Sequence, residues 1–119
     1  LVVLVLPSIS EASRNALAAV AKVVEVEEVQ NPNQLVLYRV FSKNYSILRV
    51  WQLRELTNIP YDTVIYMDGD MVMTQNSDDL CGISGFAAAQ DMGAPGARNS
   101  HMDAFNAGMM VLQPNEETF

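Results

Sequence analysis

Short, unbroken apolar runs are the feature that most constrains what this chain can fold into. Residues 1–6 form one such run, which Pro7 ends, and residues 64–67 form another. A run of this length is typical of a strand that is buried on both faces of a sheet. Because helical patterns separate the runs, the sequence predicts an α/β protein.

The order of the patterns along the chain predicts the individual elements. Ser10 is expected to cap a helix that continues to about Ala21, and residues 22–26 to form a strand parallel to the first. A second helix is expected over residues 42–56, and further strands over residues 63–67, 85–89 and 107–112. Together these elements predict a doubly wound, mostly parallel sheet in a single domain, 1–119.

Two predictions concern the core. In the second predicted helix, Ile47, Leu48, Trp51 and Leu56 fall on one side, so Trp51 is expected to be a core residue and not a platform for a ligand. Cys81 is the only cysteine in the chain. It cannot form an internal disulfide, and a small buried position is expected for it.

Size and charge narrow the possible partners. The chain has 119 residues, of which 50% are hydrophobic, and its net charge is -7. This charge argues against nucleic acid or an anionic membrane surface as a partner, because both require clustered Lys and Arg. The apolar run at the start is far shorter than the roughly 20 residues of a membrane span, and no basic residues precede it as in a signal peptide. The absence of an initial Met, and a helix start near residues 114–117, predict that the domain is incomplete at both ends.

Asp68-Gly69-Asp70 is the strongest chemical signal in the chain, and it directly follows the apolar run 64–67. Two carboxylates at positions i and i+2 of a strand project to the same side and repel each other unless a cation lies between them. Oxygen ligands favour Mg²⁺, Mn²⁺ or Ca²⁺ over Zn²⁺ and leave coordination positions for phosphate oxygens. The alternative is a solvated turn that happens to carry two acidic residues.

Beyond this motif, several segments keep a recognisable order. They are LVVLVLPSIS, LRVWQL, YDTVIYMDGDMVM, SDDL, FAAAQDMG and FNAGMMVLQPNEETF. In this order they resemble the glycogenin-like members of glycosyltransferase family 8, over nearly the whole chain. The resemblance implies a GT-A fold, incomplete at both ends, in a retaining hexosyltransferase that moves a sugar from a UDP-sugar to an acceptor.

The resemblance also implies a metal and its ligands. In such enzymes both carboxylates of the Asp-x-Asp motif meet Mn²⁺ or Mg²⁺, so Asp68 and Asp70 inherit this role and Gly69 lies with them in the donor-binding segment. The cation would stabilise the negative charge that the departing diphosphate gains.

Three more residues inherit roles near the sugar. Asp91 aligns with a family Asp that faces the donor sugar, and Asn106 with the Asn of a Phe-Asn-Ser-Gly motif that contacts the sugar near the transferred carbon. Both are implied catalytic residues. Gly108 is expected to let the backbone approach the ligand closely. Without the resemblance, the sequence favours a helix or loop cap for Asp91 and an ordinary turn residue for Asn106.

The chain also departs from the family pattern. Ile47 stands where the family often has a Lys that neutralises donor phosphate, and Lys43, Arg39 or Arg49 could substitute for it, although none lies at the matching position. Ala107 stands where Ser is usual.

Parts of the family's site lie outside this sequence. The strand that holds uridine would precede Leu1, and the third metal ligand, a His, would follow Phe119. His101 is expected to be a solvated loop residue. We therefore expect residues 1–119 alone to be inactive, and the sugar, the acceptor and the compartment stay open.

Two other functions compete with this prediction. A transferase-like interaction fragment without catalytic activity fits the departures at Ile47 and Ala107. A Mg²⁺-dependent phosphohydrolase with an Asp nucleophile would also use acidic strand ends, but Gly between the carboxylates does not suit it. An EF-hand is excluded, because its sixth loop position would be Met73 and its twelfth Asp79.

Overall fold

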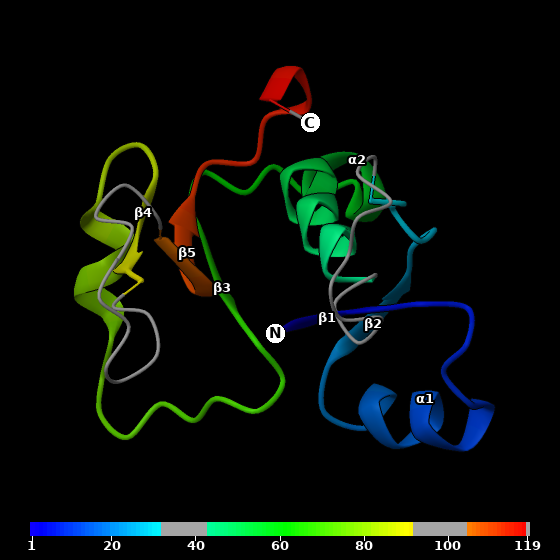
Figure 1. The fold of residues 1–119 in the computed structure, drawn as a ribbon. Coiled ribbons are helices and arrows are strands. Elements are labelled where there is room, and N and C mark those ends of the chain that lie inside the picture. The colour runs from blue at the N-terminus through cyan, green and yellow to red at the C-terminus, as the bar shows by residue number, and fades with distance from the viewer. Residues whose placement is uncertain (32–42, 92–104, 119) are drawn as a thin grey trace, which may run out of the picture. The chain divides into compact units, whose positions relative to one another are not determined.

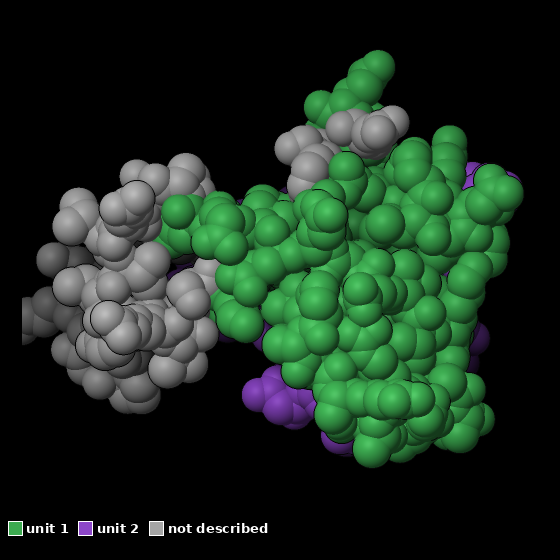
Figure 2. All heavy atoms as spheres, turned by 90° about the vertical axis from the view of Figure 1, so that its right-hand side faces the viewer, with its two compact units in different colours: residues 1–59, 115–119 green, residues 60–114 purple. Residues whose placement is uncertain are grey.

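The computed structural model describes residues 1–31, 43–91 and 105–118 (Figure 1). The chain divides into two compact units, residues 1–59 with 115–119, and residues 60–114 (Figure 2). Each unit has its own sheet and its own buried residues.

The first unit opens with a βαβ arrangement. Its elements are β1 (Val2–Val5), α1 (Glu11–Ala18) and β2 (Lys22–Glu25). β1 and β2 pair in parallel, from Val2 opposite Lys22 to Val5 opposite Glu25. The Ser10 side chain caps α1 by accepting a hydrogen bond from the Ser13 backbone N–H at 3.2 Å. The predicted cap and the parallel pairing are confirmed, but α1 ends at Ala18 and not near Ala21.

The second predicted helix has a different geometry from the one the sequence suggested. It consists of a 3-10 helix, Asn44–Gln52, followed by α2 (Leu53–Thr57). A 3-10 helix has three residues per turn, so its buried side differs from that of an α-helix. Val50 and Leu53, three residues apart, are 3% and 5% exposed, whereas Leu48 is 37% exposed. Trp51, the predicted core residue, is half-buried.

The end of α2 is set by Asn58. This residue has a positive φ of 56°, in the left-handed region that Asn tolerates better than most residues. Thr57, at the last turn, is buried and its hydroxyl donates to the Leu53 carbonyl at 2.7 Å. A short 3-10 helix, Glu116–Thr118, completes the first unit.

The second unit contains a three-stranded sheet. Its elements are β3 (Val64–Met67), a 3-10 helix (Asp78–Gly82), β4 (Ala87–Gln90) and β5 (Phe105–Leu112). The strand order is β3-β5-β4, and β5 is antiparallel to both neighbours. The α/β class is confirmed, but the sheet is not mostly parallel in the part of the chain that the structure describes. An apolar run does not encode the direction in which a strand runs, so the sequence could not reveal this.

The C-terminal half of β5 forms the core of this unit. Met110, Val111 and Leu112 are 2%, 4% and 1% exposed. Cys81, in the 3-10 helix before β4, is exposed, so its predicted burial was wrong. None of the helices in the described residues has the length and apolarity needed to span a lipid bilayer.

Candidate functional site

The sheet of the second unit places three predicted site residues at one edge. β3 and β4 both run opposite to β5. The carboxyl ends of β3 and β4 therefore lie at the same edge as the start of β5. Asp68 follows β3, Asp91 follows β4, and Asn106 is the second residue of β5.

The strand register shows how these positions are aligned. Met110 pairs with Tyr66 on one side and with Ala88 on the other. Asp68 comes two residues after Tyr66, and Asp91 comes three residues after Ala88, beyond a shift in the pairing of β4 with β5. β5 separates their strands, which are about 10 Å apart at two strand spacings.

A turn, and not a strand, holds the two acidic residues of the motif. β3 ends at Met67, and the Asp68 carbonyl accepts a hydrogen bond from the Met71 N–H at 3.1 Å. The Asp68 N–H donates to the Gly108 carbonyl at 2.8 Å, which anchors the turn to β5. Asp68, Gly69 and Asp70 are all exposed. The argument from strand alternation was therefore wrong, and the turn geometry replaces it.

Gly108 lies where two polar side chains meet. Its N–H donates to Asn106 Oδ1 at 2.8 Å. A Cβ at Gly108 would lie 2.9 Å from Asn106 Oδ1, 3.3 Å from Asp68 Oδ2 and 3.5 Å from Met71 Sδ. Asp68, Asn106 and Gly108 therefore form one cluster, here called the Gly108 cluster, which only glycine leaves undisturbed. At Gly69, by contrast, nothing lies within 4 Å of a built Cβ.

The pairing of β4 with β5 is irregular near Gly108. Ala88 pairs with Met110, but the next residue of β4, Ala89, pairs with Asn106. The segment of β5 between these partners, which includes Gly108, is displaced from the β4 ladder. Irregularities of this kind redirect side chains and recur next to functional sites.

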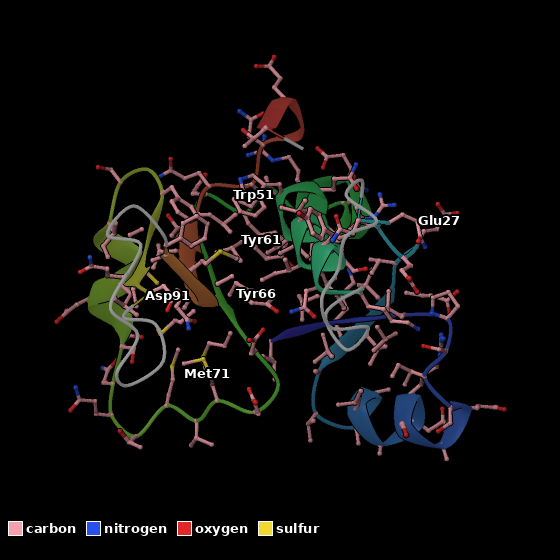
Figure 3. All side chains as sticks on the ribbon, in the orientation of Figure 1. Glu27, Trp51, Tyr61, Tyr66, Met71 and Asp91 are labelled. Atoms are coloured by element: carbon pink, nitrogen blue, oxygen red, sulfur yellow. The ribbon has the colours of Figure 1, made fainter. Side chains whose placement is uncertain are left out.

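Tyr66 is a neighbour of the cluster that the sequence reasoning missed. Its hydroxyl donates a hydrogen bond to Asp68 Oδ1 at 2.6 Å. Burial raises the pKa of Tyr66 above its ordinary value, and the hydrogen bond to Asp68 and the negative charges of Asp68 and Asp70 raise it further. Its position two residues before Asp68 is the signal that could have found it. Figure 3 labels Tyr66 on β3, Met71 in the following segment and Asp91 after β4.

No basic side chain forms an ion pair with Asp68 or Asp70 among the described residues. Two of the cations proposed as substitutes for a phosphate-binding Lys have other partners. Lys43 pairs with Glu28 at 3.4 Å, and Arg49 pairs with Glu27 at 3.9 Å. The third, Arg39, lies outside the described residues, as does His101.

The donor set fits a hard divalent cation as an incomplete site. Within residues 1–31, 43–91 and 105–118, no group of three or more His, Cys, Asp or Glu side chains is placed to hold a metal. Asp68 and Asp70 supply carboxylate oxygens, which suit Mg²⁺ and Mn²⁺. Both are exposed, and neither has a basic ion-pair partner in the part of the chain that the structure describes. Two such ligands leave positions for other oxygens.

Comparisons with known proteins address the class of this chain. No protein-family profile matches it. It is 32% identical over 121 residues to the putative UDP-glucuronate:xylan alpha-glucuronosyltransferase 3 of Arabidopsis thaliana. It is 31% identical over 124 residues to human glycogenin-1, and 29% identical over 120 residues to inositol phosphorylceramide glucuronosyltransferase 1 of Arabidopsis thaliana.

Each of these alignments covers 100% of this chain, but only 17%, 32% and 20% of the respective relative. The chain is thus related along its whole length to glycosyltransferases and spans a third or less of these proteins. Its resemblance to the glycogenin-like members of glycosyltransferase family 8 is confirmed.

Proposed function

We propose that this chain is the donor-binding part of a GT-A hexosyltransferase of glycosyltransferase family 8. In this proposal residues 1–119 belong to one incomplete domain, which binds a UDP-sugar through Mn²⁺ or Mg²⁺ at Asp68 and Asp70. The sugar passes to an acceptor with retention of configuration. The observation that carries the proposal is the turn after β3, which holds the Asp68 carboxylate near Gly108 and Asn106 and carries Asp70 two residues later. Neither carboxylate has a basic ion-pair partner among the described residues.

The relatives support the donor class. One is named for UDP-glucuronate and others are glycogenins or a second glucuronosyltransferase. A diphosphate would be repelled by a chain whose net charge is -7. A cation at Asp68 and Asp70 offsets this repulsion where the phosphates bind.

Each proposed site residue has a separate role in the reaction. When bound, the cation supplies positive charge to the leaving diphosphate. Asp68 and Asp70 hold it, with Gly69 between them. Asn106 both donates and accepts hydrogen bonds, which suits sugar hydroxyls, and Asp91 accepts from them at the same edge of the sheet. Gly108 keeps the space between Asn106 and Asp68 open.

Replacing one carboxylate of the motif tests this function in the full-length protein. Asp70→Asn keeps the shape of the side chain but removes its charge, so metal-dependent transfer from UDP-sugars should fall at least about 100-fold. This loss is at the upper end of what the removal of even an indirect metal partner costs. Transfer is measured with UDP-glucose, UDP-galactose and UDP-glucuronate, with and without Mn²⁺.

Asp62→Asn is the matched control, because Asp62 is an exposed Asp in the same unit, outside the motif. It should transfer sugar at the wild-type rate. Transfer by Asp70→Asn at the wild-type rate, or a wild-type protein that binds UDP equally well with and without Mn²⁺, would contradict the proposal.

A non-catalytic role is the second candidate. Ile47 occupies the position at which the family often has a phosphate-binding Lys. Lys43 and Arg49 form ion pairs with Glu28 and Glu27, so neither is available to replace that Lys, and this favours a non-catalytic role. In that case Asp70→Asn would leave the biological activity of the full-length protein unchanged.

A further inference from the structure

The two oxygens of the Asp68 carboxylate have different surroundings. Oδ1 accepts the Tyr66 hydroxyl at 2.6 Å. Oδ2 lies on the other side, toward Gly108, where a built Cβ would be 3.3 Å from it. Oδ1 therefore accepts a hydrogen bond from Tyr66, whereas Oδ2 lies toward Gly108.

Tyr66 itself is well placed to fix the carboxylate. It lies within β3 and is half-buried, and it pairs across the sheet with Met110, which is 2% exposed. The Asp68 backbone is fixed separately by its N–H bond to the Gly108 carbonyl at 2.8 Å. The main chain and one oxygen of Asp68 are thus both held from the sheet.

We propose that Tyr66 is a positioning residue that makes Asp68 present a single oxygen, Oδ2, to the bound cation. This inference rests on the proposed function and adds to it a determinant of metal selectivity. Hydrogen bonds from hydroxyl groups to carboxylates are short and strong, so Oδ1 does not readily leave Tyr66 to chelate a metal.

Coordination by one oxygen affects which cation binds best. Mg²⁺ and Mn²⁺ favour six oxygen ligands in octahedral geometry, whereas the larger Ca²⁺ takes six to eight and accepts both oxygens of one carboxylate. Tyr66 therefore favours the smaller cations. Without its hydroxyl, Asp68 is free to rotate and to bind through both oxygens, which suits Ca²⁺.

The test is Tyr66→Phe in the full-length protein, which removes only the hydroxyl. Dissociation constants for Mn²⁺ and for Ca²⁺ are measured separately by calorimetry in the presence of UDP. We expect Mn²⁺ to bind about 10-fold more weakly, as is typical when a partner of a metal ligand is removed, and Ca²⁺ to lose less or to gain. The preference for Mn²⁺ over Ca²⁺ therefore falls.

The matched control is Tyr45→Phe, because Tyr45 lies in the other unit and is 36% exposed. It should keep both dissociation constants and the melting temperature in EDTA. Three results for Tyr66→Phe would overturn the inference: unchanged binding of both metals, an equal loss for both, or a failure to fold, since the last two indicate a merely structural hydroxyl.

These failures differ from failure of the proposed function itself. If the wild-type protein binds UDP without any help from Mn²⁺, the metal site is absent and both proposals fail. If the wild-type protein binds Mn²⁺ with UDP and Tyr66→Phe behaves identically, only the role of Tyr66 is lost.

Discussion

At the scale of single residues, the candidate site depends on one position without a side chain. Gly108 has two polar neighbours, Asn106 Oδ1 and Asp68 Oδ2, within 2.9 and 3.3 Å of a built Cβ. Its φ is not positive, so the backbone itself would accept alanine. Glycine is needed here for space and not for conformation.

Gly108→Ala should therefore harm function more than stability. The new methyl group would displace the side chain of Asn106 or Asp68, and a displacement of about 1 Å can cost about 100-fold in rate. Both side chains reach solvent, so the free energy of unfolding should change by less than about 1 kcal/mol. Transfer rates and urea denaturation of the full-length protein check this.

Gly82→Ala is the control for this prediction. Nothing lies within 4 Å of a Cβ built at Gly82, and its φ is also not positive. It should leave both quantities unchanged. Equal effects of the two substitutions on transfer would show that the space at Gly108 does not matter.

At the scale of elements, α1 depends on a small number of polar contacts. No residue of α1 is buried, so packing contributes little to holding it. Arg14 joins α1 to Glu25 of β2 and to the Leu6 and Ile9 carbonyls. At the start of the helix, Ser10 Oγ accepts from the Ser13 N–H at 3.2 Å, and Glu11 lies in the first turn, where negative charge is favourable. A helix of this kind is sensitive to the loss of its cap.

Ser10→Ala should destabilise α1 by about 1 kcal/mol, the usual cost of losing an N-cap side chain. The amides of α1 would then exchange with deuterium about fivefold faster, as about 1 kcal/mol corresponds to that factor. Ser8→Ala, at an exposed position before the cap, should not change the exchange. Wild-type exchange in Ser10→Ala would show that the cap is not important.

The elements also show where sequence patterns work and where they stop. The Ser10 cap and the parallel pairing of β1 and β2 were predictable, because capping and βαβ connections are local rules. The 3-10 geometry of Asn44–Gln52 was not predictable, because apolar residues three positions apart share a face in an α-helix as well. The antiparallel direction of β5 could not be predicted from the sequence either.

At the scale of the whole molecule, metal and nucleotide should act as one stabilising ligand. A ligand that binds only the folded protein stabilises it by about 2.7 kcal/mol at 100 times its dissociation constant. Mn²⁺ with UDP should therefore raise the melting temperature of the full-length protein, and EDTA should reverse this. Asp70→Asn should abolish the shift, while Asp62→Asn keeps it.

A rise in melting temperature with UDP alone, undiminished by EDTA, would contradict a metal between the carboxylates and the diphosphate. A rise with Mn²⁺ that persists in Asp70→Asn would place the metal elsewhere. Both results are read from thermal denaturation curves of the same protein samples.

The sequence by itself determined the α/β class, the capped first helix, the relationship to glycosyltransferases and the position of Asp68 and Asp70, because short motifs and local periodicity encode these features. Only the tertiary structure decided that the motif forms a turn, that Tyr66 holds one oxygen of Asp68, and that Gly108 brings Asn106 beside it. The pairs between β3 and β5 join residues 42 to 48 positions apart, and no local pattern specifies which of them will meet.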